Sequence, residues 1–154
     1  MIEGRRSEET VERLGEKSGS GGSLMPLLGL AFWRMKQAFE REVGLSAATW
    51  FLLNMLIDED GISQGEVSHR FEVDPSRITR LAQRLEKEGL LRRKRDPEDN
   101  RVVRMHVTEE GRRLVESRQE RREWFEEGIR RELRQEELAE FRRVLGVVAR
   151  LMKD

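Results

Sequence analysis

The segment from Asp74 to Gly89 constrains the fold most strongly, because it carries the signals for both ends of a helix. Asp74 is a favoured N-cap residue, and Pro75 fits the first helical position, where no N–H is needed. Gly89 suits the left-handed residue that follows a helix, with Leu90 covering Leu85 as in a Schellman motif. The pattern therefore predicts one helix between Asp74 and Gly89.

Three stripes run along this predicted helix, one apolar and two polar. Ile78, Leu81 and Leu85 have the spacing of a buried face. The polar stripes consist of Arg77, Arg80 and Arg84, and of Ser76, Thr79 and Gln83. Guanidinium, hydroxyl and amide groups are what base edges and phosphates accept. A solvated arginine face would show the same pattern, so the flanking segments decide between the two interpretations.

A second capping motif lies just before this helix. Ser63 and Glu66 form the Ser-x-x-Glu pattern of a capping box, which predicts a short helix that ends near Phe71. Val73 leads directly from there into the basic helix. Two short helices joined by a tight link, with the second one basic, are typical of a helix-turn-helix.

The pattern after Gly89 is that of a β-hairpin. Residues 90–95 and 102–107 have strand character, and residues 96–100 have turn chemistry throughout. The hairpin carries the basic residues Arg92, Arg93, Lys94, Arg95, Arg101 and Arg104. A basic hairpin, or wing, beside a basic helix favours a nucleic-acid surface over a solvated arginine face.

Helical periodicity extends on both sides of this region. Ser46 is expected to cap a helix that continues to Ile57, and Thr108 to cap one long polar helix. Residues 24–43 and the helix from about Gln135 have wider apolar surfaces than one partner helix needs. A second subunit can cover the remainder. An intrachain bundle is the weaker alternative, because the winged region has its own core to fill.

Composition excludes several functional classes. The 154 residues include no Cys, which excludes disulfides, thiol catalysis and thiolate metal sites. There is also no Tyr, and His69 and His106 are the two histidines, so no nucleophile–base pair is recognisable and we expect neither an enzyme nor a cofactor. No apolar run approaches the roughly 20 residues of a membrane span. We therefore expect a cytoplasmic protein with no membrane partner.

Charge is balanced over the whole chain but not locally. The formal net charge is zero, yet the segment from Arg70 to Arg104 has eleven Lys or Arg residues and seven Asp or Glu residues. The basic excess therefore coincides with the predicted helix-turn-helix and wing.

The order helix, helix, helix-turn-helix, wing and two C-terminal helices resembles the MarR family of bacterial transcription regulators. Residues 45–50, 74–90 and 95–101 followed by 107–111 carry the likeness, which covers about residues 24–152. It implies a mainly α fold, a winged helix-turn-helix with flanking N- and C-terminal dimerisation helices. The expected divisions are 1–23 as a flexible N-terminal segment, 24–44 as the N-terminal dimerisation helix, 45–108 as the winged helix-turn-helix DNA-binding region, and 109–154 as C-terminal dimerisation helices.

The resemblance implies a homodimer that binds double-stranded DNA sequence-specifically, as a repressor on a palindromic operator. In the family's Asp-x-Arg wing motif, Asp99 would position a neighbouring arginine and Arg101 would reach the minor groove. A narrow minor groove favours a guanidinium group. Residues 63–65 would present free N–H groups to phosphate. The candidate DNA-binding residues are Ser63, Gln64, Ser76, Arg77, Thr79, Arg80, Gln83, Arg84, Arg95, Asp99, Arg101 and Arg104.

Two further expectations concern a ligand and an alternative function. Family members are often released from DNA by small aromatic or lipophilic effectors, and Trp33, Phe39 and Trp50 are the candidates to line such a pocket. Aromatic residues at helical spacing are more often core. The alternative function is a winged-helix module that binds protein without sequence-specific DNA binding. An acid-free arginine face beside a basic wing favours DNA.

Overall fold

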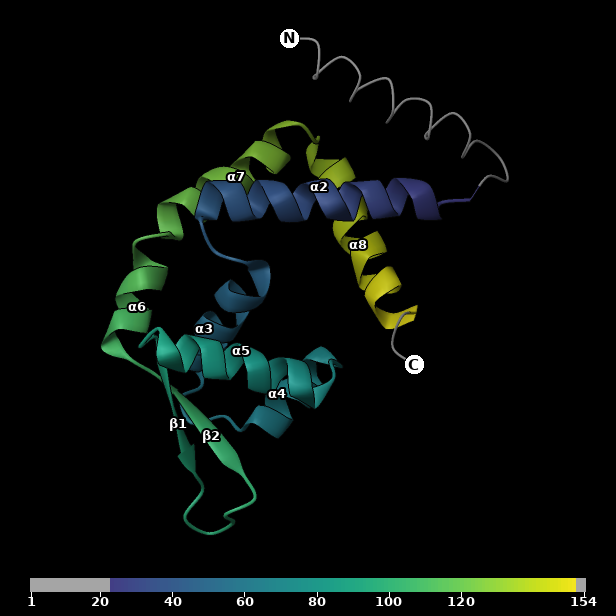
Figure 1. Ribbon diagram of the computed structural model, residues 1–154. Coiled ribbons are helices and arrows are strands. Elements are labelled where there is room, and N and C mark those ends of the chain that lie inside the picture. Colours follow the sequence, from purple (N-terminus) through teal and green to yellow (C-terminus); the bar gives the residue numbers. More distant parts are fainter. Residues whose placement is uncertain (1–22, 152–154) are drawn as a thin grey trace.

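The computed structural model describes residues 23–151, so the segment expected to be flexible, 1–23, lies outside the described residues apart from Ser23. Figure 1 shows α2 and α7 at one end of the molecule and the β1–β2 hairpin at the other, with α3, α4 and α5 between them. The elements are α2 (Met25–Val43), α3 (Ala47–Asp58), α4 (Gln64–Phe71), α5 (Pro75–Lys87), β1 (Leu91–Arg95), β2 (Val103–Val107), α6 (Glu109–Glu116), α7 (Gln119–Arg131) and α8 (Gln135–Leu151).

The sequence signals at the ends of α5 are confirmed. The Asp74 carboxylate accepts the N–H of Ser76 at 2.8 Å. At the other end Gly89 has φ +74°, and the N–H of Leu90 donates to the carbonyl of Leu85 at 2.9 Å. This is the long hydrogen bond of a Schellman motif, which ends the helix and turns the chain into β1.

The winged region has a core of its own. Its buried side chains come mainly from α3, α4, α5 and both strands, and Val43 of α2 and Val115 of α6 join them. On α5 the buried positions are Ile78, Ala82 and Leu85, so the opposite side of that helix is free to face a ligand. The side chains buried almost completely are Val43, Leu52, Leu53, Leu56, Ile62, Val67, Leu85, Leu91 and Met105.

The wing is an antiparallel hairpin tied to the start of the helix-turn-helix. Leu91 pairs with Val107 and Arg95 with Val103. Beyond this sheet, the N–H of Met105 donates to the carbonyl of Ile62 at 3.0 Å. The wing therefore keeps a fixed position relative to the residues that precede α4.

The prediction of a single long helix after Thr108 is wrong, because the chain forms two helices there. Thr108 does cap α6, accepting the N–H of Gly111 at 3.1 Å, but α6 ends at Glu116 and α7 begins at Gln119. The two helices have different neighbours, α6 packing on α3 and α7 on α2. Their packing imposes the bend visible in Figure 1, although the sequence has neither Gly nor Pro there. Within the described residues, no helix is long and apolar enough to cross a membrane.

Candidate nucleic-acid interface

The N-terminus of α4 carries the predicted capping box. The Ser63 hydroxyl accepts the N–H of Glu66 at 3.1 Å, and the N–H of Ser63 donates to the Glu66 carboxylate at 2.8 Å. The N–H of Ser63 is therefore occupied, contrary to the expectation of free N–H groups at 63–65. Gln64 and Gly65 contribute the first-turn N–H groups that have no acceptor in the described chain. The side-chain nitrogen of Gln64 is buried and also lacks a protein partner.

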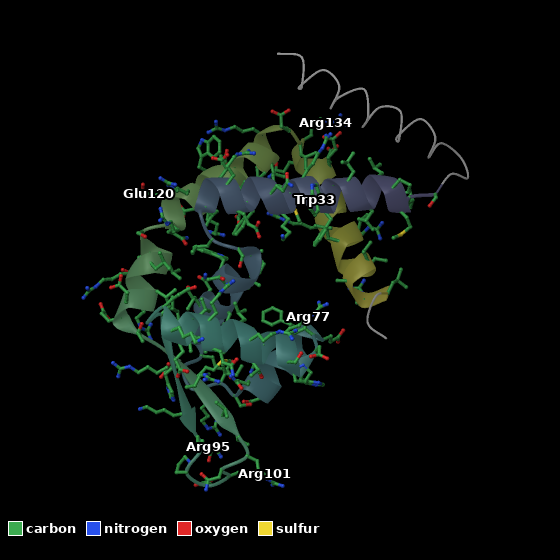
Figure 2. All side chains as sticks on the ribbon, in the orientation of Figure 1. Trp33, Arg77, Arg95, Arg101, Glu120 and Arg134 are labelled. Atoms are coloured by element: carbon green, nitrogen blue, oxygen red, sulfur yellow. The ribbon has the colours of Figure 1, made fainter. Side chains whose placement is uncertain are left out.

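The N-terminal half of α5 has an open polar face. Arg77 and Arg80 are exposed, and neither forms a salt bridge among the described residues. Figure 2 labels Arg77 near the start of the helix. Hydrogen bonds from the hydroxyl and the N–H of Ser76, with a smaller effect of both arginines, hold the pKa of Asp74 below its ordinary value. The capping carboxylate thus stays charged while both guanidinium groups remain available.

The remaining polar residues of α5 differ in whether their side chains already have hydrogen-bond partners within the protein. Ser76 and Gln83 are exposed. The hydroxyl of Thr79 donates to the carbonyl of Pro75 at 3.0 Å, which leaves its oxygen as an acceptor. Arg84 has two partners, because its Nη2 donates to the hydroxyl of Thr49 at 2.8 Å and its Nε lies 3.7 Å from the carboxylate of Glu88. The arginine stripe of the sequence is therefore divided in space, two residues being open and one bound to α3.

The tip of the wing presents an arginine held by an aspartate. The Nε of Arg101 lies 3.0 Å from Oδ1 of Asp99, and its Nη2 lies 3.1 Å from Oδ2. The Arg101 side chain is nevertheless 91% exposed. Arg95 donates to the carbonyl of Asn100 at 3.1 Å. Figure 2 shows Arg95 and Arg101 at the far end of the hairpin, so the wing ends in two guanidinium groups.

Asp96 organises the loop of the wing and was not among the predicted site residues. Its Oδ1 accepts the N–H of Glu98 at 2.8 Å and that of Asp99 at 3.1 Å, and its Oδ2 pairs with Arg104. The backbone N–H of Glu98, followed by the Arg104 guanidinium, keeps the pKa of Asp96 below its ordinary value. An Asp at the start of a turn is the sequence signal that points to this role.

Arg104 therefore braces the wing. Besides Asp96, it donates through Nη1 to the carbonyl of Gly61 at 3.1 Å. Its guanidinium joins the loop of the wing to the segment just before α4. The structure thus assigns Arg104 an internal contact, whereas Arg95 and Arg101 remain at the surface.

Two of the three aromatic residues expected around an effector come together. The rings of Phe39 and Trp50 lie edge to face with centroids 6.4 Å apart, and Phe39 stacks in the same way on Phe125 at 5.6 Å. Trp50 is buried as part of the core. Trp33 is 58% exposed on α2, so the structure does not bring it to this cluster (Figure 2).

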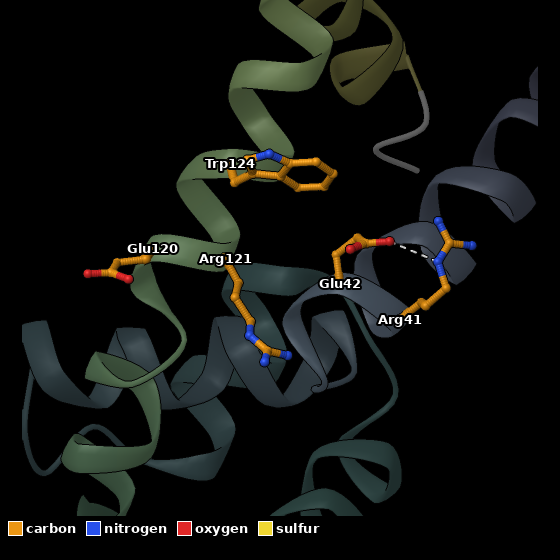
Figure 3. Close-up of a pocket in the computed structure, with 5 residues that line it drawn as sticks. All are labelled: Arg41, Glu42, Glu120, Arg121 and Trp124. Carbon is orange, nitrogen blue, oxygen red and sulfur yellow. Dashed lines mark hydrogen bonds and ion pairs between the residues drawn. The ribbon is translucent and has the colours of Figure 1, made fainter.

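A hollow lies between α2 and α7, close to the aromatic cluster. Figure 3 shows its lining, in which Glu120, Arg121 and Trp124 come from α7 and Arg41 and Glu42 from α2. The last two are paired at 2.8 Å. A neighbouring groove is apolar and includes Ala38, Trp124, Phe125, Ile129, Leu133 and Phe141. Sequence periodicity placed these residues on helix faces but could not show that the faces meet.

Comparison with known proteins identifies the family. The MarR family model matches residues 45–103. The HTH-type transcriptional regulator YdgJ of Bacillus subtilis is 36% identical over 56% of this chain and 53% of its own, and the repressor MdtR of the same organism is 34% identical over 50% and 49%. The chain thus spans about half the length of these relatives. The regulator YsmB of B. subtilis is 31% identical over 66% of this chain and 69% of its own.

Solved structures agree with the sequence relatives. PcaV from Streptomyces coelicolor, crystallised with its natural ligand, is 27% identical, with a TM-score of 0.73 over 84% of this chain and 96% of its own. BpsR from Bordetella bronchiseptica, whose DNA binding is regulated by 6-hydroxynicotinic acid, is also 27% identical, with a TM-score of 0.68 over 85% and 98%. With its winged helix-turn-helix and flanking helices, this chain belongs to the MarR family of transcription regulators.

Proposed function

We propose that the protein is a sequence-specific regulator that binds double-stranded DNA, with α5 in the major groove and the wing at the minor groove. The observation that carries this proposal is the pairing of two open arginines on α5, Arg77 and Arg80, with the Asp99-held guanidinium of Arg101 at the wing tip. A helix can read base edges in the major groove. An arginine at a protruding tip suits a narrow minor groove.

Ten of the twelve candidate residues divide into three roles under this proposal, while Arg84 and Arg104 make the internal contacts described above. Ser76, Arg77, Thr79, Arg80 and Gln83 face bases and nearby phosphates. Ser63 and Gln64, at the start of α4, lie against a phosphate, which the free N–H groups of Gln64 and Gly65 favour. Arg95 and Arg101 serve the wing, with Asp99 orienting the second of them.

The active form is proposed to be a homodimer that acts as a repressor on a palindromic operator. Large apolar side chains stay exposed along α2 and α8 in the single chain, which is the surface that a second copy would cover. Two-fold symmetry would place the two α5 helices at two half-sites. Residues of this surface include Leu24, Met25, Leu28, Phe32, Met35, Phe141, Val144, Leu145 and Leu151.

A small aromatic acid is the proposed class of effector. Arg121 and Trp124 of the hollow, together with the apolar groove beside it, would suit a ligand with one anionic group and one ring, although Glu42 and Glu120 also line the hollow. The regulation of BpsR by 6-hydroxynicotinic acid supports the same class. Phe39 packs on Phe125 of the groove, and Trp50 packs on Phe39. Trp33 lines neither the hollow nor the groove.

Selection of duplexes from a random pool by the purified protein tests the proposal. We expect a two-fold symmetric sequence, bound by a protein that sediments as a dimer, with affinity that falls as salt rises. Addition of 6-hydroxynicotinic acid should release the selected duplex and change tryptophan fluorescence together. Failure to enrich any sequence would contradict sequence-specific binding and favour the protein-binding alternative.

A further inference from the structure

Three side chains connect the end of α5 to the start of α3. The Nη2 of Arg84 donates to Oγ1 of Thr49 at 2.8 Å, and that oxygen lies 2.9 Å from Oγ of Ser46. Ser46 is the N-cap of α3 and follows Gly44, whose φ of +77° ends α2. The chain of hydrogen bonds thus runs from the predicted DNA-reading helix to the link between α2 and the winged region.

Chemistry fixes the direction of the hydrogen bond that Arg84 makes. A guanidinium only donates, so the Thr49 oxygen accepts from Arg84, while either hydroxyl of the Thr49–Ser46 pair can donate to the other. The Ser46 oxygen also accepts the N–H of Thr49 at 3.1 Å. Thr49 is only 4% exposed, and sheltered hydrogen bonds are less weakened by competing water. The Arg84 side chain itself is 54% exposed, and its Nε also lies 3.7 Å from Oε1 of Glu88 on the same helix.

We propose that Arg84 is a positioning residue that sets the orientation of α5 relative to the α2–α3 link, and not a DNA contact. The inference rests on the DNA-binding function proposed above. Arg77 and Arg80 lie on the same polar side of α5 but have no such partner within residues 23–151. A movement at the α2–α3 link is then transmitted to α5 through Arg84, while the other two arginines read the DNA.

A double-mutant cycle with a salt series tests this proposal on the full chain. Arg84→Met keeps the aliphatic stem and removes the guanidinium, and Thr49→Val keeps the shape and removes the hydroxyl. The control Arg77→Met makes the same chemical change on the same helix. Affinity is measured for the duplex that the wild-type protein selects from a random pool and for an unselected duplex.

Each of the two variants should lower affinity for the selected duplex by about tenfold, the effect of losing one hydrogen bond to a charged group. The salt slope should not change in either variant. The double variant, Arg84→Met with Thr49→Val, should bind the selected duplex no more weakly than either single variant. Thr49→Ser, which retains the hydroxyl, should bind like the wild type. Arg77→Met should lower the salt slope by about one unit per lost phosphate contact. In the double variant, its loss of affinity should add to that of Thr49→Val.

The opposite pattern overturns the proposal. If Arg84→Met lowers the salt slope and Thr49→Val has no effect, Arg84 contacts phosphate. If the wild-type protein selects no duplex, the proposed function is wrong. The melting temperatures of the same variants then test the hydrogen-bond chain by itself. Equal and non-additive decreases for Arg84→Met and Thr49→Val would support that chain, and additive decreases would refute it.

Discussion

Asp99 holds Arg101 through two parallel hydrogen bonds, of 3.0 and 3.1 Å, at the most protruding point of the wing. The pair orients the guanidinium before any ligand is bound, so less rotamer freedom remains to be lost on binding. Because the Arg101 side chain is 91% exposed, the same geometry leaves it accessible to a phosphate or a groove floor.

Arg101→Ala should weaken binding to selected and unselected DNA alike. The wing reads groove shape and charge, so the salt slope should fall by roughly one unit per lost phosphate contact per subunit. Arg134→Ala is the matched control, because Arg134 lies at the opposite end of the molecule and pairs with Glu137 at 2.7 Å (Figure 2). An equal loss in both variants would indicate an effect of net charge and not of the wing.

Acid should loosen the wing through Asp96. Hydrogen bonds from Glu98 and Arg104 lower the pKa of Asp96 in the folded state, so its stabilising contribution is present above the ordinary carboxyl pKa. That contribution is lost as pH falls through the lowered folded-state value. Asp96→Asn cannot titrate, so the decline of unfolding free energy below about pH 4 should be shallower than in the wild type. Glu136→Gln on α8 serves as control, and an identical acid dependence in all three proteins would refute the assignment.

Gly111 is required where α6 packs against the turn before β1. A Cβ at this position would overlap the carbonyl oxygen of Leu90 and lie 2.9 Å from Cγ2 of Val107. Gly111→Ala should therefore lower the unfolding free energy by about 1–3 kcal/mol, the usual range for overpacking. At Gly128 in α7 an added Cβ meets nothing within 4 Å, so Gly128→Ala should stabilise by up to about 1 kcal/mol. Denaturant unfolding measures both, and a neutral Gly111→Ala would contradict the packing described.

Removal of residues 134–154 should abolish dimerisation. It deletes α8 and leaves the apolar side chains of α2 without the partner surface that we propose for them. We expect a monomer or an aggregate that no longer binds the selected duplex. Sedimentation velocity distinguishes these states, and a truncated protein that remains a dimer would refute the proposed interface.

Local signals were read correctly from the sequence. The caps at Asp74, Ser63 and Thr108 and the stop at Gly89 are all confirmed, because each depends on groups within a few residues of one another. The hairpin was found for the same reason, since its turn chemistry and its alternation are local.

Long-range contacts could not be read in this way. Periodicity placed Arg84 in the same stripe as Arg77, but its partner Thr49 is 35 residues away in the sequence. The contact of Arg104 with Gly61 spans 43 residues. The bend between α6 and α7 likewise follows from packing on two different helices.

Affinity of Arg80→Ala for selected and unselected duplexes across a salt series tests the central claim most directly. Arg80 is exposed in the middle of α5, where a bidentate contact to guanine discriminates by roughly 1–3 kcal/mol. The variant should remain a folded dimer, lose most of its preference for the selected duplex, and keep a residual binding that is salt-sensitive. If Arg80→Ala retains its full preference for the selected duplex, α5 does not read DNA in the way proposed.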